Sequence, residues 1–165
     1  MEHYPKALDI YEQNHAEIQA YPKVKNRFLC IKVMCYALSK QTEKELQCIP
    51  ENIRQLPPDQ YYYLRFIQLI FWYQMEDWEG SLQETENFLK VLNYVNEPHF
   101  DADYKQLAYF YLDFFKAIST IPMTQKQNLI QLQTALIVCK NSKSAHNDYL
   151  LLMWLEKEVE ELLNG

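Results

Sequence analysis

Glycine is nearly absent: the 165-residue chain contains two. A β-sandwich or barrel needs a turn signal about every 8 to 12 residues, and glycine supplies many of these turns. A doubly wound α/β fold needs glycine in the loop that holds a phosphate. Two glycines cannot serve either architecture, so the composition predicts an all-α protein.

Basic clusters are also missing. The formal net charge is −6, and only three of the sixteen basic residues are arginine: Arg27, Arg54 and Arg65. Affinity for a phosphate backbone depends on clustered Lys and Arg. We therefore expect no direct contact between this domain and nucleic acid.

Long apolar segments are missing as well. The chain begins with a polar run, residues 1–5, and has no apolar stretch typical of a signal peptide. The most apolar run, residues 60–75, is interrupted by Arg65, Gln68 and Gln74 and is shorter than the roughly 20 residues that a membrane helix needs. These features predict a cytoplasmic chain with no membrane segment.

Metal and catalytic signatures are sparse. The four cysteines have no C-x-x-C spacing and no paired histidine, which is typical of buried free thiols. Glu12 and His15 form a single E-x-x-H motif, whereas a di-iron site in a helical bundle needs two such motifs. We expect no metal, no cofactor and no enzymatic activity. An enzyme with dispersed residues stays as an alternative, which clustering of His15, His99 or His146 with carboxylates would support.

Prolines and capping boxes predict where the helices begin. Pro5, Pro22 and Pro58 stand where a first-turn proline is tolerated. Thr42 and Thr124 each open a capping box, with Glu or Gln three residues later. Together with the loops between them, these signals predict about eight helices: 5–19, 22–40, 42–48, 58–76, 78–94, 101–119, 124–140 and 145–163.

The expected helices fall into two alternating classes. Those centred near residues 32, 67 and 110 are apolar around most of their circumference, while the helices between them are amphipathic. A helix that is apolar all round must be enclosed by other helices. The spacing of these centres, about 35 to 43 residues, is typical of two-helix solenoid repeats. The sequence therefore predicts one domain, residues 1–165, built as an α-solenoid of about four antiparallel helix hairpins.

One segment carries a family resemblance. Asp77-Trp78-Glu79-Gly80-Ser81-Leu82 resembles the helix junction often written D-Y-E-E-A-I in tetratricopeptide repeats, with Ser81 at the small position. The best local match covers residues 67–91, and the periodicity extends over most of the chain. The chain thus resembles the tetratricopeptide repeat superfamily.

Tyr-rich, Gly-poor repeats of this kind also resemble the ligand-binding domains of bacterial peptide-pheromone receptors of the Rap, PlcR and Rgg type. That resemblance implies a peptide-sensing domain in quorum sensing and transcription regulation. We also expect a homodimer, because the terminal repeats of a solenoid leave an apolar face that needs a cap or a partner. In those proteins an effector domain precedes the repeats. The chain is then either a C-terminal part of a larger regulator or a stand-alone relative, and both readings stay open.

Large, semi-polar side chains on the enclosed and terminal helices are the candidate peptide contacts, because a tyrosine combines rigid area with a polar tip. They are Arg27, Tyr62, Arg65, Gln68, Tyr73, Tyr104, Tyr111 and Tyr149. Arg65 is the lone cation on its helix and can meet a carboxylate of a peptide. The alternatives are a structural ion pair with Glu76, Asp103 or Asp113 for Arg65, and ordinary packing for the tyrosines.

The leading hypothesis is a non-enzymatic domain that binds a peptide or protein segment in a groove. The alternative is a dimerisation or scaffold domain without a ligand. Unpaired Tyr and Arg side chains in a groove favour the first, and a flat, aliphatic outer helix favours the second.

Overall fold

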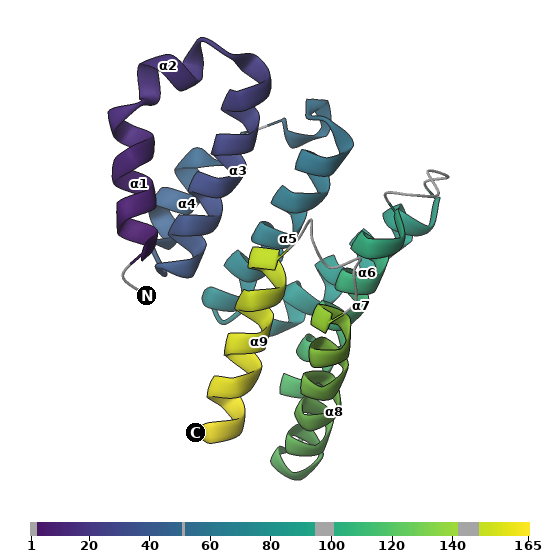
Figure 1. The fold of residues 1–165 in the computed structure, drawn as a ribbon. Coiled ribbons are helices and arrows are strands. Elements are labelled where there is room, and N and C mark those ends of the chain that lie inside the picture. The colour runs from purple at the N-terminus through teal and green to yellow at the C-terminus, as the bar shows by residue number, and fades with distance from the viewer. Residues whose placement is uncertain (1–2, 51, 95–100, 142–148) are drawn as a thin grey trace. The chain divides into compact units, whose positions relative to one another are not determined.

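The fold is helical throughout the part of the chain that the computed structural model describes, which comprises residues 3–50, 52–94, 101–141 and 149–165. The elements are α1 (His3–Gln13), α2 (His15–Gln19), α3 (Pro22–Leu38), α4 (Thr42–Cys48), the 3₁₀ turn η1 (Ile53–Gln55), α5 (Pro58–Gln74), α6 (Trp78–Tyr94), α7 (Asp101–Ile118), α8 (Pro122–Asn141) and α9 (Tyr149–Asn164) (Figure 1). The all-α prediction is confirmed.

The chain divides into two compact units, residues 1–74 and 75–165. The boundary falls between α5 and α6, within the segment that carries the tetratricopeptide resemblance. The hairpin expected from residues 58–76 and 78–94 spans this boundary, and the four-hairpin solenoid remains a prediction.

In the first unit, α3 is the central element. It packs against α1, α2, α4 and α5, and η1 packs against α5. Helix α1 runs antiparallel to α3 (Figure 1). The core of α3 contains Val33, Met34 and Ala37, all with no exposed surface. These three residues lie on one face of α3, whereas Ile31 is 44% exposed, so the enclosure expected around this helix is only partial.

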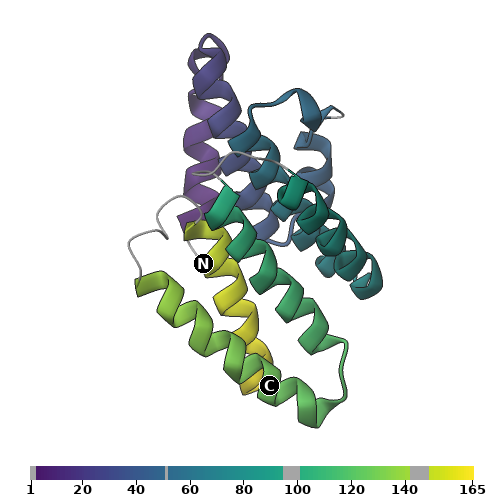
Figure 2. The ribbon, with the colours of Figure 1, turned by 90° about the vertical axis from the view of Figure 1, so that its right-hand side faces the viewer.

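In the second unit, α7 packs against α6, α8 and α9. Helices α7, α8 and α9 alternate in direction, as short connections predict (Figure 2). Helix α7 is buried around most of its circumference. Over residues 104–118, where burial is described, its exposed residues lie on one narrow stripe with the helical spacing three, four, three: Gln106, Tyr109, Asp113 and Lys116.

The expected division into enclosed and amphipathic helices holds only in part. Helices α6 and α8 each bury one face, but large apolar residues also lie on their exposed sides. On α6, Trp78 and Val91 are 36% and 40% exposed, while the small polar Ser81 and Thr85 are completely buried. Their hydroxyls donate to backbone carbonyls one turn earlier, Ser81 to Asp77 at 2.8 Å and Thr85 to Ser81 at 2.7 Å. Because these internal bonds satisfy the hydroxyls, such side chains can be buried.

Two helix starts differ from the prediction, and one expected helix is broken. Helix α1 begins at His3, two residues before Pro5. The helix expected over 5–19 is interrupted at Asn14, whose φ of −106° and ψ of 15° are not helical. The side chain of Asn14 donates to the carbonyl of Ile10 at 2.8 Å, a bond that competes with helix continuation. Helix α8 begins at Pro122, two residues before Thr124, because a first-turn proline needs no amide donor. The start expected at 145 lies outside the described residues.

Candidate functional site

One side of α5 is partly open to solvent. Tyr61, Arg65, Gln68 and Trp72 follow one another at the spacing four, three, four, which places them on a single face of the helix. The first three are half-buried, and Trp72 is 38% exposed. We call these four residues the α5 stripe. Seven other side chains of α5 are buried, whereas Tyr63, Phe71 and Tyr73 are half-buried on other sides of the helix. The α5 stripe contains the exposed Trp72, and we take it as the candidate contact surface of α5.

The polar centre of the α5 stripe is organised. Arg65 Nη1 donates to Gln68 Oε1 at 3.1 Å, one turn along the helix. This bond restricts both long side chains, and Arg65 makes further contacts within the chain. Because the side-chain oxygen of Gln68 accepts in this bond, its amide group has hydrogens that can bind a peptide carbonyl. The ion-pair alternative for Arg65 stays a prediction, because Asp103 lies outside the described side chains and Glu76 and Asp113 belong to the other unit.

Sequence reasoning selected Arg65 and Gln68 but missed their neighbours Tyr61 and Trp72. The signal was present: both lie four residues from one member of the pair, one helical turn away. In contrast, Tyr62 and Tyr73 lie on a different side of α5. Tyr62 is 4% exposed, its ring is 5.5 Å from that of Tyr61, and it belongs to the core rather than to an open surface.

The other candidate in the first unit is Arg27 on α3. Its side chain is exposed, and it precedes Phe28, which is half-buried. Arg27 therefore lies near the first turn of α3 and not on the α5 stripe.

The three candidates of the second unit have different environments. Tyr149 is 50% exposed at the start of α9, whereas Tyr104 is 5% exposed. Tyr111 has no exposed surface, and its hydroxyl donates to the carbonyl of Leu151 at 3.3 Å. We assign Tyr111 to the core of the unit. For this residue we favour the alternative named above, ordinary packing between helices, over peptide contact.

The single E-x-x-H motif is engaged in packing. Glu12 Oε1 accepts a hydrogen bond from Lys32 Nζ at 2.8 Å, and His15 meets the ring of Tyr11 edge to face at 5.6 Å. The Lys32 ammonium also lies 4.5 Å from the centre of the Tyr11 ring. The hydrogen bond from Lys32 holds the pKa of Glu12 below its ordinary value. This cluster attaches α1 to α3.

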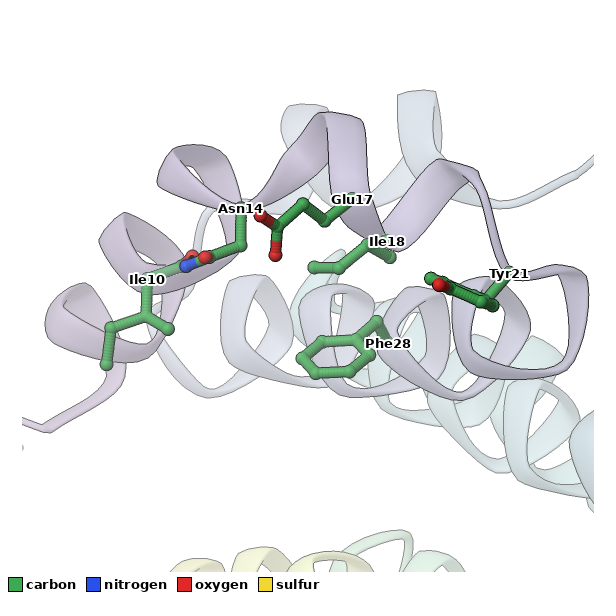
Figure 3. A pocket seen from close by; sticks show the side chains of 6 residues that line it. All are labelled: Ile10, Asn14, Glu17, Ile18, Tyr21 and Phe28. Atoms are coloured by element: carbon green, nitrogen blue, oxygen red, sulfur yellow. Dashed lines mark hydrogen bonds between the residues drawn. The ribbon is translucent and has the colours of Figure 1, made fainter.

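A pocket of about 290 Å³ opens where α1, α2 and the first turns of α3 meet. Figure 3 shows its six lining side chains, with the Glu17 carboxylate between Asn14 and Ile18 and the Phe28 ring across from Ile18. We call this the N-terminal pocket. Its remaining walls are Ile10 and Tyr21. Sequence reasoning did not find it, because it depends on the interruption at Asn14.

A second depression, of about 420 Å³, lies between α7 and α8. Its lining is mixed: Asp113 and Lys116 come from α7, and α8 contributes Asn128 and Gln131 together with the apolar Leu132 and Ala135. Partial burial raises the pKa of Asp113, and the nearby Lys116 opposes this change. The depression places donors and acceptors side by side on the open stripe of α7.

Within the described residues, no three His, Cys, Asp or Glu side chains gather as a metal site would require. His99 and His146 lie outside the described part of the chain. No described helix combines enough length with enough apolarity to cross a membrane. No protein-family model, no curated protein and no solved structure matches this chain.

Proposed function

We propose that this chain is a non-enzymatic interaction domain that binds a peptide or protein segment, with the α5 stripe as a principal contact surface. The observation that carries the proposal is the Arg65 and Gln68 pair, joined at 3.1 Å and flanked along the helix by Tyr61 and Trp72. Tyrosine, tryptophan and arginine are the residues that most often dominate binding energy at protein interfaces.

The contacts give each residue a role. The amide of Gln68 presents donors to the backbone carbonyls of an extended segment, and the guanidinium of Arg65 places a positive charge beside them that attracts a carboxylate. The partly open rings of Tyr61 and Trp72 offer rigid area that a ligand can cover with little loss of conformational entropy. In the wider context that the Rap, PlcR and Rgg resemblance implies, such a domain would sense a peptide for a bacterial transcriptional regulator.

A peptide-display selection against the purified domain tests this proposal. Peptides selected on the wild-type chain should bind the Arg65→Ala variant about tenfold or more weakly, because a charge-assisted bond is lost. Arg54→Ala is the matched control, since Arg54 is an exposed arginine of η1 in the same unit. Unchanged affinity together with a large fall in melting temperature would assign Arg65 to the structure instead.

A specific observation favours dimerisation as a second candidate function. Helix α8 buries Leu129, Leu132, Leu136 and Cys139, while its outer side exposes Met123 (88%), Ile130 (48%) and Ile137 (49%) at intervals of seven residues. Residues seven apart lie on one helical face, so these three apolar side chains share the outer side of α8, where Lys126, Gln127 and Thr134 also lie. Such a face is typical of an interface.

Charged substitutions on the outer side of α8 distinguish dimerisation from peptide binding. If α8 forms a dimer interface, Ile130→Lys with Ile137→Lys should convert a dimer to a monomer in sedimentation equilibrium. Gln106→Lys, on the exposed stripe of α7, should leave the subunit number unchanged. A wild-type chain that is monomeric at all concentrations would remove this second candidate.

A further inference from the structure

The N-terminal pocket has an apolar interior. Ile18 is 6% exposed and Phe28 is half-buried, so these two side chains form its inner part. Ile10 and Tyr21 stand at 58% and 65% exposure and form its walls. Covering such surface releases about 25 cal/mol for each Å² of apolar area removed from water. Entry of an apolar group into the pocket is therefore favourable, because it removes this apolar surface from water.

The size of the pocket limits what can enter. Pockets that enclose whole small molecules are typically about 300 to 1,000 Å³. At about 290 Å³, the N-terminal pocket is at the lower end of that range. Because it is also open on one side (Figure 3), it suits one large side chain of a longer ligand better than a complete cofactor.

The polar atoms at the mouth are mainly acceptors. The carboxylate of Glu17 is exposed and has no ion-pair partner among the described residues. Asn14 Nδ2 donates to the carbonyl of Ile10, so its Oδ1 is left as an acceptor. None of the six lining residues is cationic. An apolar cavity with a carboxylate at its edge is complementary to an apolar group that carries a neighbouring positive charge.

We propose that the N-terminal pocket holds one large apolar side chain of a bound peptide, and that Glu17 pairs with the lysine, arginine or amino terminus next to that side chain. This inference rests on the proposed function, because it names the kind of segment that the domain binds. It adds a second contact region to the first unit, distinct from the α5 stripe. The rings of Tyr21 and Phe28 add a face on which a cation can lie.

The test uses minimal probes in place of an unknown peptide. The probes are acetyl-Leu-Lys-amide and acetyl-Phe-Lys-amide, which carry both features, together with acetyl-Leu-Glu-amide and acetyl-Ser-Lys-amide, which each lack one. Titration into ¹⁵N-labelled protein is followed by NMR at the amides of Ile10, Ile18 and Phe28. Ligands this small should bind with dissociation constants on the order of millimolar.

Two substitutions examine the pocket without disturbing the core. Glu17→Gln keeps the shape of the side chain and should weaken the two apolar lysine probes about threefold, the size expected of an exposed ion pair. Tyr21→Ser removes an exposed wall and should weaken both about fivefold. The Tyr21 side chain makes no capping bond, and its carbonyl still accepts from the amide of Lys25, so α3 should keep its start. Glu43→Gln, an exposed acid of α4, is the control.

The expected result is a clear order. Both apolar lysine probes shift the pocket amides, the glutamate and serine probes bind several-fold more weakly, and Glu17→Gln removes the preference for lysine over glutamate. Equal binding of Leu-Lys and Leu-Glu probes would overturn the pairing with Glu17. Absence of shifts at the pocket amides up to the solubility limit would overturn the pocket itself.

Failure here is distinguishable from failure of the proposed function. If selected peptides still depend on Arg65 while the probes do not bind, only the pocket assignment is wrong. If the probes bind as described but no selected peptide depends on Arg65, the α5 stripe loses its role and the pocket keeps its own. A concentration-dependent dimer that blocks the probes would show that a second copy occupies the pocket, and would overturn the peptide assignment.

Discussion

Tyr111 stacks on Trp154, with ring centres 5.5 Å apart and ring planes 17° from parallel. The contact joins α7 to α9, and the Tyr111 hydroxyl reaches the backbone of α9 at Leu151. Phe114 packs edge to face against the ring of Trp154, with ring centres 5.9 Å apart. These contacts explain why the second unit buries a tyrosine completely, since its ring is packed and its one polar atom is bonded.

Loss of this aromatic contact should destabilise the second unit strongly. Trp154→Ala should lower the free energy of unfolding by about 3 to 5 kcal/mol, because it leaves a large cavity. Tyr111→Phe should lower it by about 1 kcal/mol, the usual net value of one hydrogen bond. Urea denaturation measures both, and Tyr109→Phe on the exposed stripe of α7 is the matched control. A Tyr111→Phe variant as stable as the wild type would show that the bond to Leu151 contributes nothing.

Asp77 and Gly80 should behave as a coupled pair at the start of α6. Asp77 Oδ1 accepts from the Gly80 amide at 2.9 Å, and a methyl group on Gly80 would come within 2.5 Å of Asp77 Oδ2. Asp77→Ala should remove the cap and lower the free energy of unfolding by about 1 kcal/mol. Gly80→Ala should be nearly neutral alone, because the gain in helix propensity is offset when Asp77 moves.

In the Asp77→Ala background the same Gly80→Ala change should stabilise by up to about 1 kcal/mol, since nothing then obstructs the methyl group. Thermal melts of the two single variants and the double variant complete the cycle. Additive effects would mean that the close contact between Asp77 and Gly80 does not govern this helix start.

The ion pair between Glu12 and Lys32 predicts a definite pH dependence. Lys32 lowers the pKa of Glu12, so this carboxylate stabilises the fold above the ordinary Glu pKa of 4.5 and loses that contribution as the pH falls through the lower folded value. The pair is partly exposed, with 57% of the Glu12 side chain accessible, so its contribution should be below about 1 kcal/mol. Glu12→Gln should therefore be less stable than the wild type at pH 7 and equally stable at low pH.

Glu43→Gln, which removes an exposed acid of α4, is the comparison for this pH series. Chemical denaturation at intervals from pH 7 to pH 3 gives the difference curve. If the gap between Glu12→Gln and the wild type widened as the pH fell, the assigned direction of the Glu12 shift would be wrong.

Thiol labelling should report the burial of α3. Burial raises the pKa of Cys30 to about 12, and Cys30 is 7% exposed. Since the thiolate is the reactive form, Cys30 should resist a thiol reagent at pH 8 and react when the protein unfolds. Peptide mapping after brief and long exposure follows the reaction. Rapid labelling of Cys30 in the native protein would show that the helices around it open readily.

The sequence predicted the helices better than it predicted their buried faces. Low glycine content and helical periodicity are properties of the whole chain, and they identified the all-α class, while prolines and capping boxes identified most of the helix starts. On α6, the small Ser81 and Thr85 are buried, whereas the large apolar Trp78 and Val91 are partly exposed. Hydropathy favours the larger apolar residues, whereas close helix packing favours small ones whose hydroxyls bond to their own helix.

The candidate site was predicted only in part. The lone cation on an apolar helix drew attention to Arg65, and the structure adds its bond to Gln68 and the flanking Tyr61 and Trp72. Tyr111 is buried and therefore does not belong with these surface residues. Helical periodicity could not predict its burial, because α7 is buried on nearly every side and spacing alone does not tell which residues are exposed. Asn14, whose backbone is not helical, lines the N-terminal pocket at the break between α1 and α2. The hydrophobic pattern does not predict such a break, because it arises when a polar side chain bonds to the backbone and competes with the helix.

Native mass spectrometry tests peptide recognition by the α5 stripe most directly, on the wild-type chain and the Arg65→Ala variant, each purified from the protein's own host. If the α5 stripe binds a segment, the wild-type chain should carry a peptide or protein segment. The variant, with an unchanged melting temperature, should have lost most of it. Bare subunit masses in both samples, or the same bound segment in equal amount, would contradict the assignment of the α5 stripe as a recognition surface.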